Sequence, residues 1–429
     1  MVMLMPNPVN GVYKETLPNG LVVITEPMEY FHSVSVGVWL RNGSRREPAE
    51  INGISHFIEH MVFKGTQRRS AEDIAREVDR VGGMLDAFTA KEMVCFNTRV
   101  LAEHLPKAFD VLADMVLDPK FAGDDIDREK SVVLEEIRMT QDNPEDLVHE
   151  LFTQNFWNPH SLGKPILGTP ETVSALTQDT LRDWFRDSYA PNNLVITAAG
   201  HLTHAQLVDL VAERFSHLSP STKNGDQPPP KPAPHITLRT KHELEQVHIC
   251  IGVPALPLTD RRRFAVSVLN NVLGGGMSSR LFQNIRERLG LAYAIFSEMN
   301  SYRDAGMLSV YAGTSLETAG KLIHCVLDEF RQLKDEPLGD EELQRAKDHL
   351  KGATLLALEG TGSRMNSLAR YHMYFNRHFT AQELIAMLES VTAEEVQEIA
   401  REFFQPGRVA ASVVGALDGF ELTPAQLVF

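Results

Sequence analysis

The chain has few cysteines for its size. Its 429 residues include only three, Cys95, Cys250 and Cys325, and long stretches of sequence separate them. Their neighbours are apolar, so we expect small buried side chains rather than reactive thiols. A disulfide-stapled protein is thereby excluded, and the pattern fits a reducing compartment. We predict a cytoplasmic location.

The sequence also lacks any apolar run of about 18 residues, the length that a membrane-spanning helix needs. It begins Met1-Val2-Met3-Leu4-Met5-Pro6, an apolar stretch that proline interrupts and that no basic segment precedes. Such a start has neither the form of a secretory signal nor that of an arginine-rich mitochondrial presequence. We expect no membrane association.

Positive charge is scarce: 42 lysines and arginines stand against 57 acidic residues, for a formal net charge of −15. Nucleic-acid binding requires a basic surface, so we expect no nucleic-acid partner. An acidic protein can attract basic peptides, although solubility alone would explain the same charge. The triple glycine Gly274-Gly275-Gly276 lacks a following Gly-Lys-Ser/Thr, so a phosphate loop is not expected.

What the chain does contain is a globular composition, with 43% hydrophobic and 23% charged residues, and a length that exceeds one ordinary domain. Three pairs of identical residues lie 215 positions apart: Thr177 and Thr392, Pro191 and Pro406, Gly200 and Gly415. In both places a helical pattern ends at the proline and a strand pattern follows. The repetition indicates two homologous domains.

A proline-rich stretch separates the two halves, with six prolines between Ser216 and His235. Such a stretch forms neither a helix nor a sheet ladder and acts as a semi-rigid spacer. We predict an N-terminal domain over residues 1–218, a linker over 219–235 and a C-terminal domain over 236–429.

Strand and helix patterns alternate within each half. Strands are predicted at 21–25, 34–40 and 95–100, and helices at 70–81 and 105–116. We therefore predict an α+β fold, in which each domain is a mainly antiparallel β-sheet that helices cover on one face.

The most informative motif is His56-x-x-Glu59-His60. On a helix, residues i and i+4 lie on one face, so both imidazoles can reach one metal ion with the glutamate beside them. This order is one of the inverted zinc-site signatures. Asn52-Gly53 suits the start of such a helix, and Gly65 suits a C-terminal glycine cap. Among 16 histidines, a chance match of surface residues is the alternative.

A catalytic zinc ion usually takes three protein ligands and keeps one position for water, so a third ligand is needed. The acidic segment 124–138 is predicted to be a helix with an apolar stripe. Glu129 and Glu136 are seven residues apart on it and so share a face. The spacing does not distinguish Glu135 from Glu136 as the ligand, and the segment could equally be a solvated acidic helix.

Glu136 follows the second histidine by 76 residues, and the complete pattern resembles the M16 (pitrilysin or insulinase) family of zinc metallopeptidases. The resemblance implies His56, His60 and Glu136 as zinc ligands. It also implies Glu59 as the base that activates water and Glu129 as an accessory acidic residue. Further stretches agree with it over nearly the whole chain: 43–47, 63–66, 86–89, 163–169 and 189–194. Zinc is favoured by ligand type, although geometry alone does not exclude manganese or cobalt.

The second half has no equivalent of the metal motif. Aligning Gly65 with Gly274 puts Ala265, Val268 and Leu269 where the two histidines and the glutamate stand. These side chains cannot bind zinc, so we expect this domain to serve mainly structure.

The resemblance assigns substrate contacts as well. In the segment 279–293 it implies that Arg286 and Tyr293 contact the substrate near the scissile bond and help to stabilise the oxyanion. Ala87, Phe88 and Thr89 would belong to the edge strand to which a substrate peptide adds as a further β-strand. Without the resemblance, Arg286 would be interpreted as a surface residue of a helix and Tyr293 as a residue at the start of a strand.

The family's long members carry four such domains in one polypeptide, and this chain carries two. By resemblance it is the short, two-domain M16B type, similar to the processing peptidase of mitochondria. We expect a zinc-dependent endopeptidase that cleaves unfolded peptides or short protein segments in a closed chamber. It would act as a homodimer, or as a heterodimer with a paralogous M16 subunit.

Two alternatives remain. One is a presequence-processing subunit, but only Gly274-Gly275-Gly276 stands where a partner subunit would have a long glycine-rich loop. The other is a non-catalytic structural subunit of the kind found in respiratory-complex cores. The intact set of His56, Glu59, His60 and Glu136 argues against that alternative.

Overall fold

The computed structural model describes residues 10–221 and 227–429. They form two compact units, each assembled from three stretches of the chain. The first unit comprises the described residues of Met1–Ile137, Lys164–Gln227 and Leu356–Thr380, and the second those of Arg138–Gly163, Pro228–Leu355 and Ala381–Phe429. The first nine residues and part of the predicted linker lie outside the described residues, and the predicted domain boundaries stay a prediction.

A six-stranded sheet forms the centre of the first unit. In spatial order its strands are β1 (Tyr13–Thr16), β2 (Val22–Pro27), β6 (Leu194–Gly200), β3 (Ser33–Leu40), β5 (Val94–Leu101) and β4 (Met84–Thr89). Only β2 and β6 are parallel. The central strand β3 is buried along almost its whole length, as expected of a strand covered on both faces. β4 alternates between exposed and half-buried residues at the edge.

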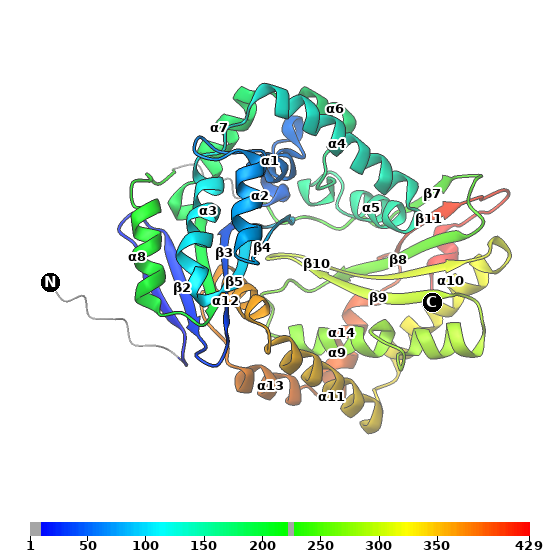
Figure 1. The fold of residues 1–429 in the computed structure, drawn as a ribbon. Coiled ribbons are helices and arrows are strands. Elements are labelled where there is room, and N and C mark those ends of the chain that lie inside the picture. Colours follow the sequence, from blue (N-terminus) through cyan, green and yellow to red (C-terminus); the bar gives the residue numbers. More distant parts are fainter. Residues whose placement is uncertain (1–9, 222–226) are drawn as a thin grey trace. The chain divides into compact units, whose positions relative to one another are not determined.

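Helices cover both faces of this sheet (Figure 1). One face packs against α1 (Ile54–Val62), α2 (Ala71–Arg80), α3 (Leu105–Leu117), α7 (Gln178–Ser188) and α8 (His204–Phe215) in one hydrophobic core. The longer α4 (Gly123–Asp142) and the short α6 (Pro170–Ala175) adjoin it. The opposite face packs against α12 (Thr361–Phe375), from far along the chain: Met365 and Leu368 cluster with Trp39, Cys95 and Val195.

The second unit repeats this design. Its five-stranded sheet has the order β7 (Ile236–Thr240), β11 (Ala410–Gly415), β8 (Val247–Ala255), β10 (Gly306–Thr314) and β9 (Ala294–Ser301), and only β7 and β11 are parallel. One face carries α9 (Arg263–Gly274), α10 (Leu316–Asp335) and α14 (Ala393–Phe403). The other face carries α5 (Pro144–Phe156), whose Val148, Phe152 and Phe156 cluster with Ala410 and Val414.

In the described part of the chain, the remaining elements are α11 (Asp340–Ala357), α13 (Ala381–Glu389), the π-helix η6 (Phe282–Arg288) and six short 3₁₀ helices. The latter are η1 (Ser44–Arg46), η2 (Ala49–Ile51), η3 (Ala102–His104), η4 (Ser161–Gly163), η5 (Pro191–Asn193) and η7 (Pro424–Leu427). No helix among the described residues is long and apolar enough to cross a membrane.

The predicted α+β fold with two homologous, mainly antiparallel domains is confirmed. The prediction that helices cover only one face of each sheet is wrong, because α12 and α5 pack on the second faces. The recurring threonines are equivalent N-caps: Thr177 accepts a hydrogen bond from the third residue of α7, and Thr392 does the same for α14. Two of the helices that were not predicted connect the halves of the chain. α5 and α12 each cover the sheet of the unit built mainly from the other half of the chain.

One local expectation is wrong and another is confirmed. Gly65 was predicted to cap the metal-motif helix, but α1 ends at Val62 with Phe63 as its C-cap. Gly65, at a φ of 120°, lies in the turn beyond. The cysteines are unpaired, with Cys95 and Cys250 buried and Cys325 half-buried. Burial raises the pKa of all three thiols, which keeps them protonated and unreactive.

Candidate metal centre

Helix α1 presents the predicted motif on one side because its other side is built into the core. Ile54, Phe57, Ile58 and Met61 are completely buried. The spacing of these apolar residues leaves His56, Glu59 and His60 half-buried on the remaining face. Gly53 begins the helix, as predicted.

Helix α4 supplies the acidic residues. Ile126, Val133 and Ile137 are buried and fix its rotation about its axis. Glu129 is then buried at 5% exposure, whereas the Glu136 side chain is 36% exposed. Both glutamates reach the histidines of α1, as their seven-residue spacing predicted.

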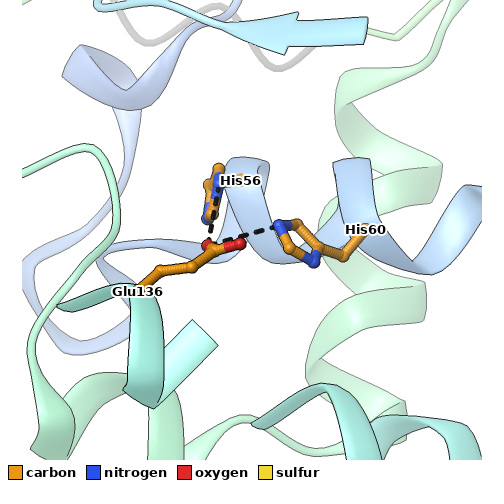
Figure 2. A group of neighbouring side chains, drawn as sticks. All are labelled: His56, His60 and Glu136. Atoms are coloured by element: carbon orange, nitrogen blue, oxygen red, sulfur yellow. Dashed lines mark ion pairs between the residues drawn. The ribbon is translucent and has the colours of Figure 1, made fainter. Parts of the chain in front are cut away.

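His56, His60 and Glu136 converge on one point (Figure 2). Glu136 Oε2 lies 3.7 Å from His56 Nε2 and 3.5 Å from His60 Nε2. One ligand atom from each of the three residues lies within 4.8 Å of the other two. Glu135, which the spacing could not separate from Glu136, is not in this group. Among the described residues no other group of three histidines, cysteines or acidic residues is placed to hold a metal ion.

Glu129 stands behind His60. Its Oε2 lies 3.1 Å from His60 Nδ1, and its Oε1 lies 2.6 Å from Lys64 Nζ. A carboxylate that accepts a hydrogen bond from Nδ1 fixes the imidazole's tautomer and turns Nε2 toward the metal position. From the sequence, Lys64 belongs to the stretch 63–66 that agrees with the family, but it has no predicted role. Its spacing, four residues after His60, is a further signal for this position.

This donor set fits zinc. Burial, and next the neighbouring His60, lower the pKa of His56 to about 4, so its imidazole is neutral at neutral pH. A neutral imidazole is the form that binds metal. His56 Nδ1 is buried with no hydrogen-bond partner among the described residues, and its Nε2 faces Glu136. Two histidines and one carboxylate match the ligands of known catalytic zinc sites, which keep a further position open.

Glu59 lies beside the ligands on α1 and is held by the sheet. The Thr89 hydroxyl at the end of β4 donates a hydrogen bond to Glu59 Oε2 at 2.5 Å. Burial raises the pKa of Glu59, which Asp86 and Glu136 also raise, while the Thr89 hydrogen bond and His60 oppose the shift. A carboxylate with a raised pKa is a stronger base, which suits proton transfer near neutral pH.

The strand that carries Thr89 is an edge strand. Among the described residues β4 pairs only with β5, so one row of its backbone groups has no strand partner. Ala87 and Thr89 share one face of the strand, and Phe88 lies on the other. The Phe88 ring packs edge-on against Trp39, with 5.8 Å between ring centres.

Arg286 and Tyr293 lie together in the second unit. The Arg286 guanidinium carbon is 4.5 Å from the Phe282 ring centre and 5.4 Å from the Tyr293 ring centre. Tyr293 is 81% exposed. In the same unit, Ala265, Val268 and Leu269 are buried in α9, where they pack in the core and offer no metal ligand.

Comparison with known proteins identifies relatives along the whole chain. Residues 22–170 match the profile of the family described as Insulinase (Peptidase family M16), and residues 175–350 match that of the Peptidase M16 inactive domain. The uncharacterized zinc protease YmxG of Bacillus subtilis is 41% identical over 92% of this chain and 96% of its own length. The uncharacterized zinc protease SCO5738 of Streptomyces coelicolor is 39% identical over 95% of this chain and 90% of its own length.

Solved structures share the fold. A protease from Helicobacter pylori superposes with a TM-score of 0.87 at 21% identity, covering 94% of this chain and 99% of its own. A peptidase M16 inactive domain from Pseudomonas fluorescens gives a TM-score of 0.86 at 20% identity, covering 94% of this chain and 98% of its own.

Proposed function

Because the chain belongs to the insulinase family of zinc proteases, peptidase family M16, we propose that it is an endopeptidase of unfolded peptides and short protein segments. His56, His60 and Glu136 hold the zinc ion, and Glu59 is the base. One observation carries this assignment: the three ligand atoms lie within 4.8 Å of one another. Glu59 projects from the same helix as the two histidines.

A zinc ion held by His56, His60 and Glu136 would supply Lewis-acid chemistry for the scissile carbonyl and for a water at the site. Glu59 takes a proton from the attacking water and passes it to the leaving amine nitrogen. The Thr89 hydroxyl donates to Oε2 of Glu59 and so holds the carboxylate in place. Glu129 holds the ring of His60 in place through Nδ1.

The substrate binds as an added strand along the unpaired edge of β4, next to Ala87, Phe88 and Thr89. Thr89 supports this placement because it belongs to β4 and also contacts Glu59, so a peptide on this edge brings its backbone near the base. Recognition through backbone hydrogen bonds depends little on side chains. Unfolded segments are therefore the expected substrates.

Arg286 and Tyr293 contact the substrate and stabilise the oxyanion. The exposure of Tyr293 and the stacking of Arg286 against its ring support this role, since both groups are accessible to a peptide. The working protein is a dimer of two such chains, or of this chain and a paralogous M16 subunit, around a closed chamber. Light scattering together with activity during dilution tests this arrangement, and full activity from a stable monomer would contradict it.

The decisive experiment combines metal analysis with cleavage of a quenched, unstructured peptide, comparing wild type with Glu59→Gln. The glutamine oxygen can still accept the Thr89 hydrogen bond, so the variant should keep its zinc. Its turnover should fall by about 10²–10⁴-fold, the usual contribution of general-base catalysis. A wild-type chain that binds zinc but cleaves nothing would point to a missing partner subunit. A chain that binds no metal would refute the assignment.

A further inference from the structure

The helix that carries the metal motif cannot cap its own N-terminus. Its N-cap is Gly53, which has no side chain and adopts a φ of 97°. The first N–H groups of any helix lack acceptors within the helix. In α7 and α14, Thr177 and Thr392 accept these bonds through their own hydroxyls. Helix α1 must find its acceptor elsewhere.

Glu47 supplies that acceptor from outside the helix. Its Oε2 accepts hydrogen bonds from the backbone N–H of Gly53 at 2.7 Å and from Asn52 Nδ2 at 2.9 Å. Its Oε1 accepts from the backbone N–H of Ser55 at 2.9 Å. Glu47 is only 1% exposed. Burial raises the pKa of Glu47, while these three hydrogen bonds oppose the shift and favour the carboxylate. A carboxylate can only accept hydrogen bonds, which matches the three N–H donors and the positive end of the helix dipole.

A second contact holds the same helix start. Asn52 Nδ2 also donates to the carbonyl of Pro165 at 3.0 Å. The two backbones touch there: a Cβ on Gly53 would lie 2.6 Å from the carbonyl oxygen of Leu167, and one on Gly168 would lie 2.4 Å from that of Asn52. Residues 43–47 and 163–169 are two of the stretches that carry the family resemblance, and the resemblance gives them no task. Both stretches meet at the first residues of α1.

We propose that Glu47 is a positioning residue of the metal centre, because it fixes the first turn of α1 and thereby the direction of His56. His56 is the third residue of that helix, and only a set first turn keeps its Nε2 3.7 Å from Glu136 Oε2. The inference rests on the proposed function, since it treats His56 as a zinc ligand. On this inference Glu47 does not contact the metal ion and acts on it through the backbone of α1.

The test compares Glu47→Gln with Glu26→Gln. Glutamine at 47 keeps one acceptor oxygen but turns an NH₂ group toward an N–H donor. Glu26 is the control: it is a half-buried glutamate of the same unit, on β2, where it pairs with Arg364. The readouts are zinc affinity, from competition with a chromophoric chelator, and the visible spectrum of the cobalt-substituted protein, which reports coordination geometry.

We expect Glu47→Gln to weaken zinc binding by about tenfold or more, as changes to residues that support ligands do, and to alter the cobalt spectrum. Glu26→Gln should lower the melting temperature while leaving affinity and spectrum unchanged. Wild-type affinity and spectrum in Glu47→Gln would overturn the proposal, and so would an equal loss in Glu26→Gln.

If Glu47→Gln does not fold, Asn52→Ala decides the question. It removes one donor to Glu47 and the bond to Pro165, and a smaller but measurable loss of zinc affinity is expected. Unchanged affinity would overturn the proposal. A wild-type protein that binds zinc without cleaving peptide would bear on the proposed function alone and point to a missing partner subunit, whereas one that binds no zinc would refute both proposals.

Discussion

At the scale of single residues, the metal centre depends on which of two adjacent glutamates faces α1. Glu136 has Oε2 near both histidines, and Glu135 is outside the group. Glu136→Gln should therefore weaken zinc binding by more than about 100-fold, beyond the 10–100-fold loss typical of residues that only support ligands. Glu135→Gln, equal in charge change and one residue away, should leave it unchanged. Chelator competition measures both, and equal losses would show that local charge matters more than ligand geometry.

A second prediction concerns His372, in α12, far along the chain from the metal motif. It is 8% exposed, and Arg41 donates a hydrogen bond to its Nε2 at 2.9 Å. Burial, and next the charges of Lys14 and Arg41, lower its pKa to about 4. In the unfolded chain the pKa of a histidine is about 6.5. Between these values the unfolded state binds a proton that the folded state rejects, so the free energy of unfolding falls as the pH falls.

As the pH falls from about 6.5 to about 4, the titration of His372 should lower the free energy of unfolding by at most about 3 kcal/mol. In His372→Gln the side-chain oxygen still accepts from Arg41 but cannot titrate, so its free energy of unfolding should fall less between pH 7 and pH 4.5. Urea unfolding of both proteins with chelator present measures the difference. Identical pH dependence in the two would contradict the assignment of the neutral histidine.

The residues near the metal show what sequence alone could predict. His56, Glu59 and His60 were placed correctly on one face of a helix because the i, i+3 and i+4 positions of a helix are local geometry. The choice between Glu135 and Glu136 depends on how α4 is rotated against α1, which is a tertiary property. The bond between Glu47 and the start of α1 joins positions whose relative placement is set by the loop between them. No periodicity reveals such a bond.

At the scale of elements, α12 is the least expected feature of the first unit. Its apolar residues Met365, Leu368, Ala369 and Met373 are all buried, and it packs on β3 and β6 (orange in Figure 1). The sequence shows that such a segment is amphipathic, but nothing in its pattern tells which sheet it covers. Strands such as β3 and β5 and helices such as α2 and α3 were predicted because their periodicity and turn residues lie within each element.

The packing of α12 predicts a difference between two leucines. Leu368 is 2% exposed, so Leu368→Ala should lower the free energy of unfolding by about 2–5 kcal/mol. Leu356 is 69% exposed in the same stretch of the first unit, and Leu356→Ala should change stability by less than about 0.5 kcal/mol. Urea unfolding of the two variants measures both values. A small effect at Leu368 would mean that α12 contributes little to the core.

At the scale of the whole molecule, neither unit is a continuous half of the chain. The first needs residues 356–380 and the second needs residues 138–163. A fragment of residues 1–227 therefore lacks α12 and leaves the sheet face of Trp39, Cys95 and Val195 uncovered, so it should aggregate when expressed alone. Co-expression with residues 228–429 should restore a soluble complex, because each fragment supplies the helix that the other's sheet requires.

Gel filtration and sedimentation of the fragments, alone and together, measure this outcome. A fragment of residues 1–227 that is soluble and unfolds cooperatively at the wild-type midpoint would show that α12 is dispensable.

The duplication itself was readable from sequence because Thr177 and Thr392 open equivalent helices. The placement of α5 and α12 on each other's sheets was not readable from the sequence. It changes which parts of the chain pack together but leaves the pattern within each half intact.

The place of α12 in the chain also sets the order of events during synthesis. A ribosome that has completed β6 must still translate more than 150 residues before α12 emerges to cover the first sheet. At about 5–20 residues per second, this interval lasts on the order of 10 s. Throughout it, the nascent chain exposes an apolar sheet face that it cannot yet bury. Translation speed and holdase chaperones should therefore affect the yield of this protein more than that of one whose domains are completed in turn.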